Sequence, residues 1–165
     1  MSPLLKTGKR SSYPSAAAGT VRVVIWLLRH GDAAPGSPDA ERSLTSKGER
    51  QGTNAGCALA ALGVALEACL TSPKVRAVET ARRAGEALGL EPVTEPRLSG
   101  GPFDPREVAA DWEDVLLVGH DPDFSTAVHD LTGAQVRLSK GGLAGVDRGE
   151  LRVLLGPSEL AAIVG

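Results

Sequence analysis

The apolar positions of this chain form two unbroken runs that predict the centre of a sheet. Residues 23–28 are six consecutive apolar residues, and an Arg-His-Gly tripeptide follows them directly. Residues 115–118 repeat this pattern and lead into a Gly-His pair. Unbroken runs of this kind, rich in β-branched residues, are typical of strands that are buried on both faces. Both runs therefore predict central strands of a sheet that helices cover.

Between these strands the apolar residues return at helical spacing, and capping residues mark where helices begin. The first predicted helix begins at Thr45 or Ser46, since a glutamate three residues after Ser46 has the spacing of a capping box. The helix continues to about residue 62, with Ala55, Leu59 and Leu62 on its buried side.

A second predicted helix covers residues 73–88. Ser72 is its expected N-cap, Pro73 suits its first turn, and Gly89 ends it. Apolar runs and breakers predict the other elements: helices over 104–112 and 121–131, and strands over 69–71, 92–98, 142–146 and 151–155.

This alternation of strands and helices predicts one α/β domain over residues 21–165. Residues 1–20 carry three basic side chains, no acidic ones and no apolar periodicity. We interpret them as a flexible basic tail. An organelle transit peptide is the alternative that the lack of acidic residues leaves open.

The composition argues against nucleic-acid, membrane and disulfide chemistry. A net charge of −2 and 3% aromatic residues provide neither bulk attraction to nucleic acid nor a surface for base stacking. The apolar run at residues 23–28 is too short to cross a bilayer. Cys57 and Cys69 lack the spacing of metal or redox sites, so we expect a reducing, cytoplasmic compartment.

Polar side chains follow three predicted strands at the point where each strand ends. Arg29 and His30 come after the strand predicted at residues 23–28, and His120 comes after the strand predicted at residues 115–118. Arg76 lies in the first turn of the helix predicted over 73–88, just past the end of the strand predicted over 69–71. Because the carboxyl ends of parallel strands meet at one edge of a sheet, we expect these side chains to converge. A solvated side chain is the alternative for Arg76, although a cation there opposes the helix dipole unless an anion binds beside it.

Two arginines and two histidines at one place suit a phosphate group. Guanidinium groups match phosphate oxygens bidentately and stay charged at any working pH. A neutral imidazole can attack phosphorus and carry the phosphoryl group as a covalent intermediate. A metal site is the rival for the two histidines, but no carboxylate or cysteine stands at ligand spacing, and the arginines would repel a cation. The pattern therefore favours phosphoryl transfer without a metal.

Several motifs of the chain resemble the histidine phosphatase superfamily, which has the phosphoglycerate mutase-like fold. LRHG at 28–31 matches the superfamily's RHG signature, and other matching motifs follow in the expected order: RSLTSKG at 42–48, SPKVRA at 72–77, TA at 80–81 and VGH at 118–120. Within the superfamily the chain is similar to the SixA-type phosphohistidine phosphatases, through DA at 32–33, GHDPDFS at 119–125 and LSKGGLA at 138–144. The resemblance covers roughly residues 21 to 160.

This resemblance implies both a fold and a set of roles. The implied fold is a three-layer αβα sandwich around a mostly parallel central sheet, with no metal and no cofactor. His30 would be the nucleophile that becomes phosphorylated, and the phosphate pocket would consist of Arg29, Arg76 and His120.

One departure from the superfamily bears on the substrate. Members that cleave phosphate esters supply a carboxylic acid from the segment after the third strand, where this chain has EPRLSGG and no clean match. An alkoxide needs a proton donor, whereas the ring of phosphohistidine is protonated near neutral pH and can leave as neutral imidazole. The missing acid therefore favours P–N over P–O cleavage. Three nearby candidates for an acid, with exposed loop carboxylates as the alternative interpretation, are Glu95, Asp104 and Glu107. Asp32, directly after the RHG motif, is a fourth candidate, and its alternative role is to orient a loop or His30.

The sequence thus predicts a phosphohistidine phosphatase that acts on a phosphorylated protein. The expected partner is a histidine-containing phosphotransfer domain in signal transduction. Residues 90–112 are the longest segment available for a lid, and their modest length indicates an open site that suits a protein substrate. A small-molecule phosphomonoesterase with the same His30 chemistry is the alternative, and a non-catalytic module that binds phosphorylated residues is the third hypothesis. Lys140 is either a substrate contact or a solvated turn residue.

Overall fold

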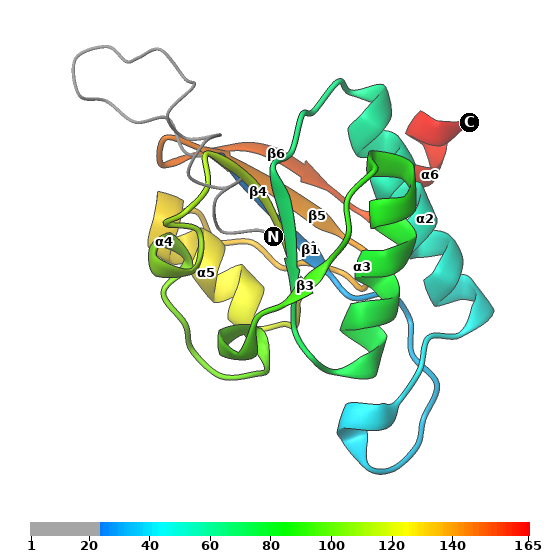
Figure 1. Cartoon of the computed structure of the whole chain (residues 1–165). Coiled ribbons are helices and arrows are strands. Elements are labelled where there is room, and N and C mark those ends of the chain that lie inside the picture. Colours follow the sequence, from blue (N-terminus) through cyan, green and yellow to red (C-terminus); the bar gives the residue numbers. More distant parts are fainter. Residues whose placement is uncertain (1–23) are drawn as a thin grey trace.

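The computed structural model describes residues 24–165, which form a six-stranded sheet between two layers of helices (Figure 1). The strand order is β3-β2-β4-β1-β5-β6. The first four strands in this order run parallel, and the last two pair antiparallel at one edge. The predicted α/β fold, a three-layer sandwich around a mostly parallel sheet, is confirmed. The strands are β1 (Val24–Arg29), β2 (Ala68–Thr71), β3 (Val93–Thr94), β4 (Asp114–Gly119), β5 (Leu143–Asp147) and β6 (Glu150–Leu155).

The first unbroken apolar run forms β1, a central strand that is buried on both faces. It lies between β4 and β5, and the five residues from Val24 to Leu28 are all buried. Successive side chains enter opposite cores, because side chains alternate across a strand. Ile25 and Leu27 belong to one core, whereas Trp26 and Leu28 belong to the other.

Helices cover both faces of the sheet. On one face lie α2 (Ser46–Ala61), α3 (Val75–Leu88) and the C-terminal α6 (Pro157–Val164), and on the other lie α4 (Pro105–Val108) and α5 (Asp123–Thr132) (Figure 1). None of the described helices is both long and apolar enough to cross a membrane. Residues 1–20, predicted as a flexible basic tail, lie outside the described residues.

The starts of α2 and α3 decide between the predicted caps. Thr45 is the N-cap of α2, because its hydroxyl accepts the backbone N–H of Gly48 at 3.1 Å. Helix α3 begins two residues later than predicted, at Val75, and Lys74 takes the N-cap position. The hydroxyl of Ser72 accepts the backbone N–H of Lys74 at 3.1 Å, ahead of the helix. At its other end α3 stops at Gly89, which has φ 68° as predicted for a glycine cap.

The end of α2 corrects one predicted core position. Ala55 and Leu59 are fully buried, whereas Leu62 is half exposed. Helix α2 ends at Ala61, and Leu62 is already its C-cap, so its side chain no longer follows the buried stripe of the helix.

Residues 92–112 differ most from the predicted elements. The strand predicted over 92–98 is limited to β3, because Pro96 starts a short 3-10 helix, η3 (Pro96–Leu98), and proline cannot donate to a strand ladder. The helix predicted over 104–112 is limited to α4. After α4 the chain continues in tight turns, in which Ala110 and Trp112 each donate to the carbonyl three residues earlier.

The C-terminal part agrees with the predicted strands and adds one helix. Helix α5 and strands β5 and β6 lie within two residues of the predicted ranges. Helix α6 was not predicted, because it is short and Leu160 is its only described residue that is buried. The carboxylate of Glu159 accepts the backbone N–H of Gly156 and holds the first turn.

Candidate active site

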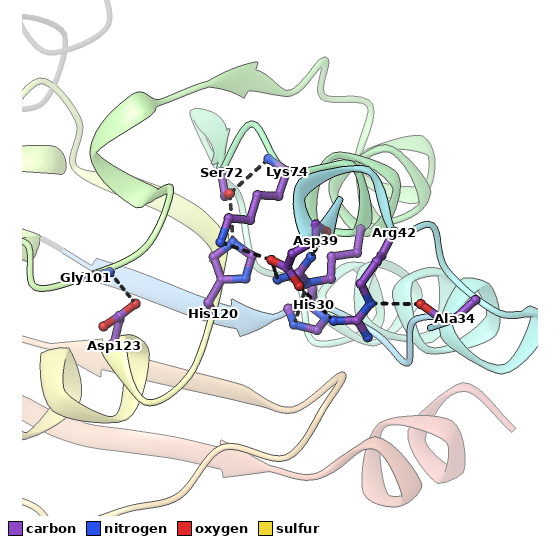
Figure 2. A network of polar contacts seen from close by, with 10 residues as sticks. His30, Ala34, Asp39, Arg42, Ser72, Lys74, Gly101, His120 and Asp123 are labelled. Atoms are coloured by element: carbon purple, nitrogen blue, oxygen red, sulfur yellow. Dashed lines mark hydrogen bonds and ion pairs between the residues drawn. The ribbon is translucent and has the colours of Figure 1, made fainter. Parts of the chain in front are cut away.

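The structure brings the predicted side chains together at the carboxyl ends of the parallel strands. His30 directly follows β1 and His120 directly follows β4, and the backbone N–H of His30 donates to the carbonyl of Gly119 at 2.9 Å. The two imidazole rings lie 5.3 Å apart between centroids, and each residue is 7% exposed. Arg76 reaches the same place from the first turn of α3 (Figure 2).

The segment after β1 is held tightly against the helices. The backbone N–H of Gly31 donates to the Thr80 hydroxyl of α3 at 3.0 Å. A Cβ at Gly31 would lie 2.6 Å from the carbonyl oxygen of Gly48 in α2, so only glycine allows this approach. The glycine after His30 therefore lets α2 and α3 enclose the nucleophile candidate.

The hydrogen bonds of His30 assign its tautomer. Nδ1 lies 2.7 Å from the carbonyl oxygen of Gly31, which can only accept, so Nδ1 carries the proton. Nε2 is therefore unprotonated, and it accepts from Nε of Arg76 at 3.4 Å. Burial, followed by the positive charges of Arg76 and Arg29, lowers the pKa of His30 to about 4, against the raising effect of the Gly31 hydrogen bond. The ring is neutral at pH 7, and its Nε2 lone pair is available.

His120 has the opposite arrangement. Its Nε2 lies 2.8 Å from the hydroxyl of the fully buried Ser72. That hydroxyl accepts from the Lys74 backbone and can donate its own proton to Nε2, and in that arrangement Nδ1 of His120 carries the ring proton. Burial, followed by the charges of His30 and Arg76, lowers the pKa of His120 to about 3. Nδ1 is buried without a protein partner.

The arginines supply fixed positive charge. Arg29 donates from Nη1 to the carbonyl oxygen of Leu138 at 2.8 Å, and its Nε is buried without a protein partner. Arg76 is 6% exposed. A buried donor without an acceptor costs about 1–3 kcal/mol, so the open donors of Arg29 and His120 favour an anionic ligand at this site.

The sequence analysis missed Asp39, a residue of the 3-10 helix η2 (Asp39–Glu41). Its Oδ2 lies 3.1 Å from Nη2 of Arg76 and 3.5 Å from Nζ of Lys74, and its Oδ1 lies 3.1 Å from Nη1 of Arg42 (Figure 2). Hydrogen bonds from Arg42 and Arg76 lower the pKa of Asp39 to about 2. Pro35, Gly36 and Pro38 give the segment around Asp39 the sequence of an ordinary connection, and only the neighbouring motif that contains Arg42 indicates a site there.

The predicted acid candidates have other partners. Asp32 accepts from the Thr45 hydroxyl at 2.8 Å, and this bond holds the pKa of Asp32 below its usual value. Glu95 forms a two-pronged pair with Arg97, which lowers the pKa of Glu95. Asp104 caps α4, and the exposed Glu107 follows it on the same helix.

Lys140 lies at the edge of the candidate site. Its Nζ is 3.5 Å from Oδ1 of Asp32, and its charge contributes to the lowered pKa of His30. Within residues 24–165, no three His, Cys, Asp or Glu side chains are grouped as metal ligands. Neutral histidines among arginines and lysines suit an anion rather than a cation.

The chain is similar in sequence to a known family of phosphatases. Residues 25–104 match the family model described as histidine phosphatase superfamily (branch 1). An uncharacterized protein of Picosynechococcus sp. (strain PCC 7002) is 34% identical over 145 residues, which cover 78% of this chain and 87% of that protein.

Solved structures share the fold over most of the chain. The protein histidine phosphatase SixA, solved in complex with tungstate, is 25% identical, with a TM-score of 0.73 and coverage of 84% of this chain and 99% of that one. A putative phosphohistidine phosphatase SixA from Agrobacterium tumefaciens is 22% identical, with a TM-score of 0.72 and coverage of 82% and 98%. A putative alpha-ribazole-5'-P phosphatase from Escherichia coli K-12 is 20% identical, with a TM-score of 0.65 and coverage of 82% and 97%.

Proposed function

Because the chain belongs to the histidine phosphatase superfamily and is of the SixA type, we propose that it removes phosphate from phosphohistidine on a protein, with His30 as the nucleophile. The observation that carries this proposal is the state of His30. Its ring is buried and neutral, Nδ1 is bonded to the Gly31 carbonyl, and Nε2 faces Arg76. A nucleophilic imidazole needs this protonation state.

The first step transfers the phosphoryl group to the enzyme. The lone pair on Nε2 of His30 forms a bond to phosphorus while the bond from phosphorus to the substrate nitrogen breaks. The electron pair of the broken bond stays on the substrate imidazole, and His30 becomes phosphorylated. Nδ1 keeps its proton, and the Gly31 carbonyl stabilises the charge that the ring gains.

The surrounding donors stabilise the group in transfer. Arg29, Arg76 and Nδ1 of His120 would hold the equatorial oxygens, whose negative charge dominates the energetics of phosphoryl transfer. Because these donors are already in place, little reorganisation is required when the charge develops.

The second step returns the enzyme to its starting state. The oxygen of a water molecule forms a bond to phosphorus while the bond from phosphorus to Nε2 of His30 breaks. The electron pair returns to Nε2, the water proton goes to solvent, and inorganic phosphate leaves. No co-reactant other than water is needed.

The engagement of two acid candidates supports a phosphohistidine substrate. The carboxylates of Asp32 and Glu95 are both engaged and have a lowered pKa, which makes them poor proton donors near neutral pH. An ester needs such a donor, whereas a protonated phosphoimidazole does not. We take the substrate to be a histidine-containing phosphotransfer domain in cytoplasmic signal transduction.

Turnover of two substrates tests this function. Wild type and His30→Ala are compared on a phosphohistidine-bearing protein and on an aryl phosphate ester. We expect rapid loss of phosphate from the protein and slow ester hydrolysis, with both activities reduced at least about 1,000-fold in the variant. Efficient hydrolysis of small esters by wild type would favour a metabolite phosphatase instead, and full activity of His30→Ala would overturn the mechanism.

A further inference from the structure

A carboxylate stands among the cations of the candidate phosphate pocket. Asp39 contacts Arg76 through both its backbone carbonyl, 2.8 Å from Nη1, and its side chain, 3.1 Å from Nη2. Lys74 and Arg42 hold the same carboxylate at 3.5 Å and 3.1 Å. A negative group so close to bound phosphate weakens the binding of a dianion, so its presence needs a reason.

The carboxylate lies on the solvent side of the pocket. The Asp39 side chain is 56% exposed, whereas that of Arg76 behind it is 8% exposed. Figure 2 shows Asp39 between Arg42 and the histidine pair, with Lys74 reaching toward it. A leaving group must depart toward solvent, and the exposed carboxylate of Asp39 lies on the solvent side of Arg76.

Arg76 can bind Asp39 and phosphate at the same time. A guanidinium group has five N–H donors, and the described hydrogen bonds of Arg76 use three of them, one to His30 and two to Asp39. Two donors remain for phosphate oxygens. The carboxylate therefore does not have to leave when substrate enters, and it stays beside the phosphoryl group.

Asp39 is also unsuited to be the missing acid. Three cationic side chains surround its carboxylate and stabilise the ionised form. An ionised carboxylate at this position can accept a hydrogen bond but cannot give a proton to an alkoxide.

We infer that Asp39 is a specificity-determining residue, which selects phosphohistidine over phosphate esters by accepting the ring N–H of the protonated substrate imidazole. This inference rests on the proposed function. When the bond from phosphorus to the ring nitrogen breaks, its electron pair stays on that nitrogen, and the ring leaves neutral with its N–H still bonded to Asp39. An ester oxygen has no N–H and meets only the negative charge of the carboxylate.

The test compares Asp39→Asn with wild type on phosphoimidazole and on an aryl phosphate ester. Phosphoimidazole has the P–N bond without any protein surface, so docking does not enter the comparison. We expect the ratio of kcat/KM for phosphoimidazole to that for the ester to fall about tenfold, the effect of one charge-assisted hydrogen bond. Inorganic phosphate should inhibit the variant at lower concentration than wild type, because a like charge is gone.

Two further variants make the result specific. Glu41→Gln removes one exposed charge from the same 3-10 helix and should leave the ratio unchanged. Asp39→Glu keeps the charge and should retain most of the preference. If Asp39→Asn changes kcat/KM for both substrates by the same factor, Asp39 does not discriminate between them and the inference is wrong. If wild type fails on phosphoimidazole and on phosphohistidine protein alike, the proposed function itself fails.

Discussion

The carboxyl ends of β1 and β4 have nearly the same sequence pattern and opposite chemistry. Each is a buried apolar strand that leads into a histidine, and the two rings lie 5.3 Å apart. At the β1 end a backbone carbonyl binds Nδ1, and Nε2 of His30 faces Arg76. At the β4 end a serine hydroxyl binds Nε2 and leaves Nδ1 of His120 open. The partner of each ring, rather than the strand pattern, is the basis on which we propose His30 as the nucleophile and His120 as a hydrogen-bond donor.

Replacing His120 tests this division of roles most strongly. Loss of one donor to a developing oxyanion lowers kcat by about 100-fold or more, so His120→Ala should slow turnover by that factor. His30 should still accept the phosphoryl group in this variant. The measurement is rapid quenching with a radiolabelled phosphohistidine protein, followed by mapping of the labelled peptide.

The covalent label provides the control for this experiment. His30→Ala should carry no acid-labile label at any time point. A label on His120 in either wild type or His30→Ala would reverse the two assigned roles.

Ser72 should matter because it selects the tautomer of His120. Ser72→Ala removes the bond at Nε2, and the ring can then place its proton on either nitrogen, which we expect to lower kcat about tenfold. The imidazole ¹⁵N chemical shifts of His120 report the change directly, and a purely structural role would not move them. Ser99→Ala is the matched control, because the Ser99 hydroxyl bonds only the Pro96 carbonyl in a turn. Unchanged ¹⁵N shifts in Ser72→Ala would contradict the assignment.

The strand ends could be predicted because their signals are local in the sequence. A strand that is buried on both faces requires an unbroken apolar run, and the polar residues directly after it must lie at the sheet edge. Arg29, His30 and His120 were found in this way. Arg76 was found through its position in the first turn of the following helix.

The rest of the site depends on contacts between distant segments. Asp39 meets Arg76 across 37 positions of the chain, and Ser72 meets His120 across 48. Neither pairing leaves a periodic or capping pattern in the sequence. Residues 92–112 differ from the prediction for a local reason instead. The side chain of Glu95 accepts the backbone N–H of Arg97 and begins the 3-10 helix that ends the predicted strand.

His30 and His120 should both make the stability of the protein depend on pH, and the direction of the effect should be the same for the two residues. Both have a pKa that burial lowers, to about 4 for His30 and about 3 for His120, below the value of about 6.5 expected in the unfolded chain. Between pH 6.5 and these values the unfolded chain binds more protons than the folded one. Their contribution to the free energy of unfolding is therefore complete above pH 6.5 and is lost as the pH falls to the folded pKa of each ring, about 4 for His30 and about 3 for His120.

Urea unfolding at pH 7.5 and pH 5.0, at constant ionic strength, measures this contribution. At pH 5.0 both rings are still neutral in the folded protein, so the lower pKa of His120 gives it no larger effect than His30. We expect His30→Asn and His120→Asn each to lose about 2 kcal/mol less stability than wild type between the two pH values. A variant that loses as much stability as wild type would show that its histidine is not held neutral. That result for His30 would remove the basis for a neutral nucleophile. The same result for His120 would leave the proposed nucleophile unaffected and would indicate that His120 binds phosphate as a charged imidazolium.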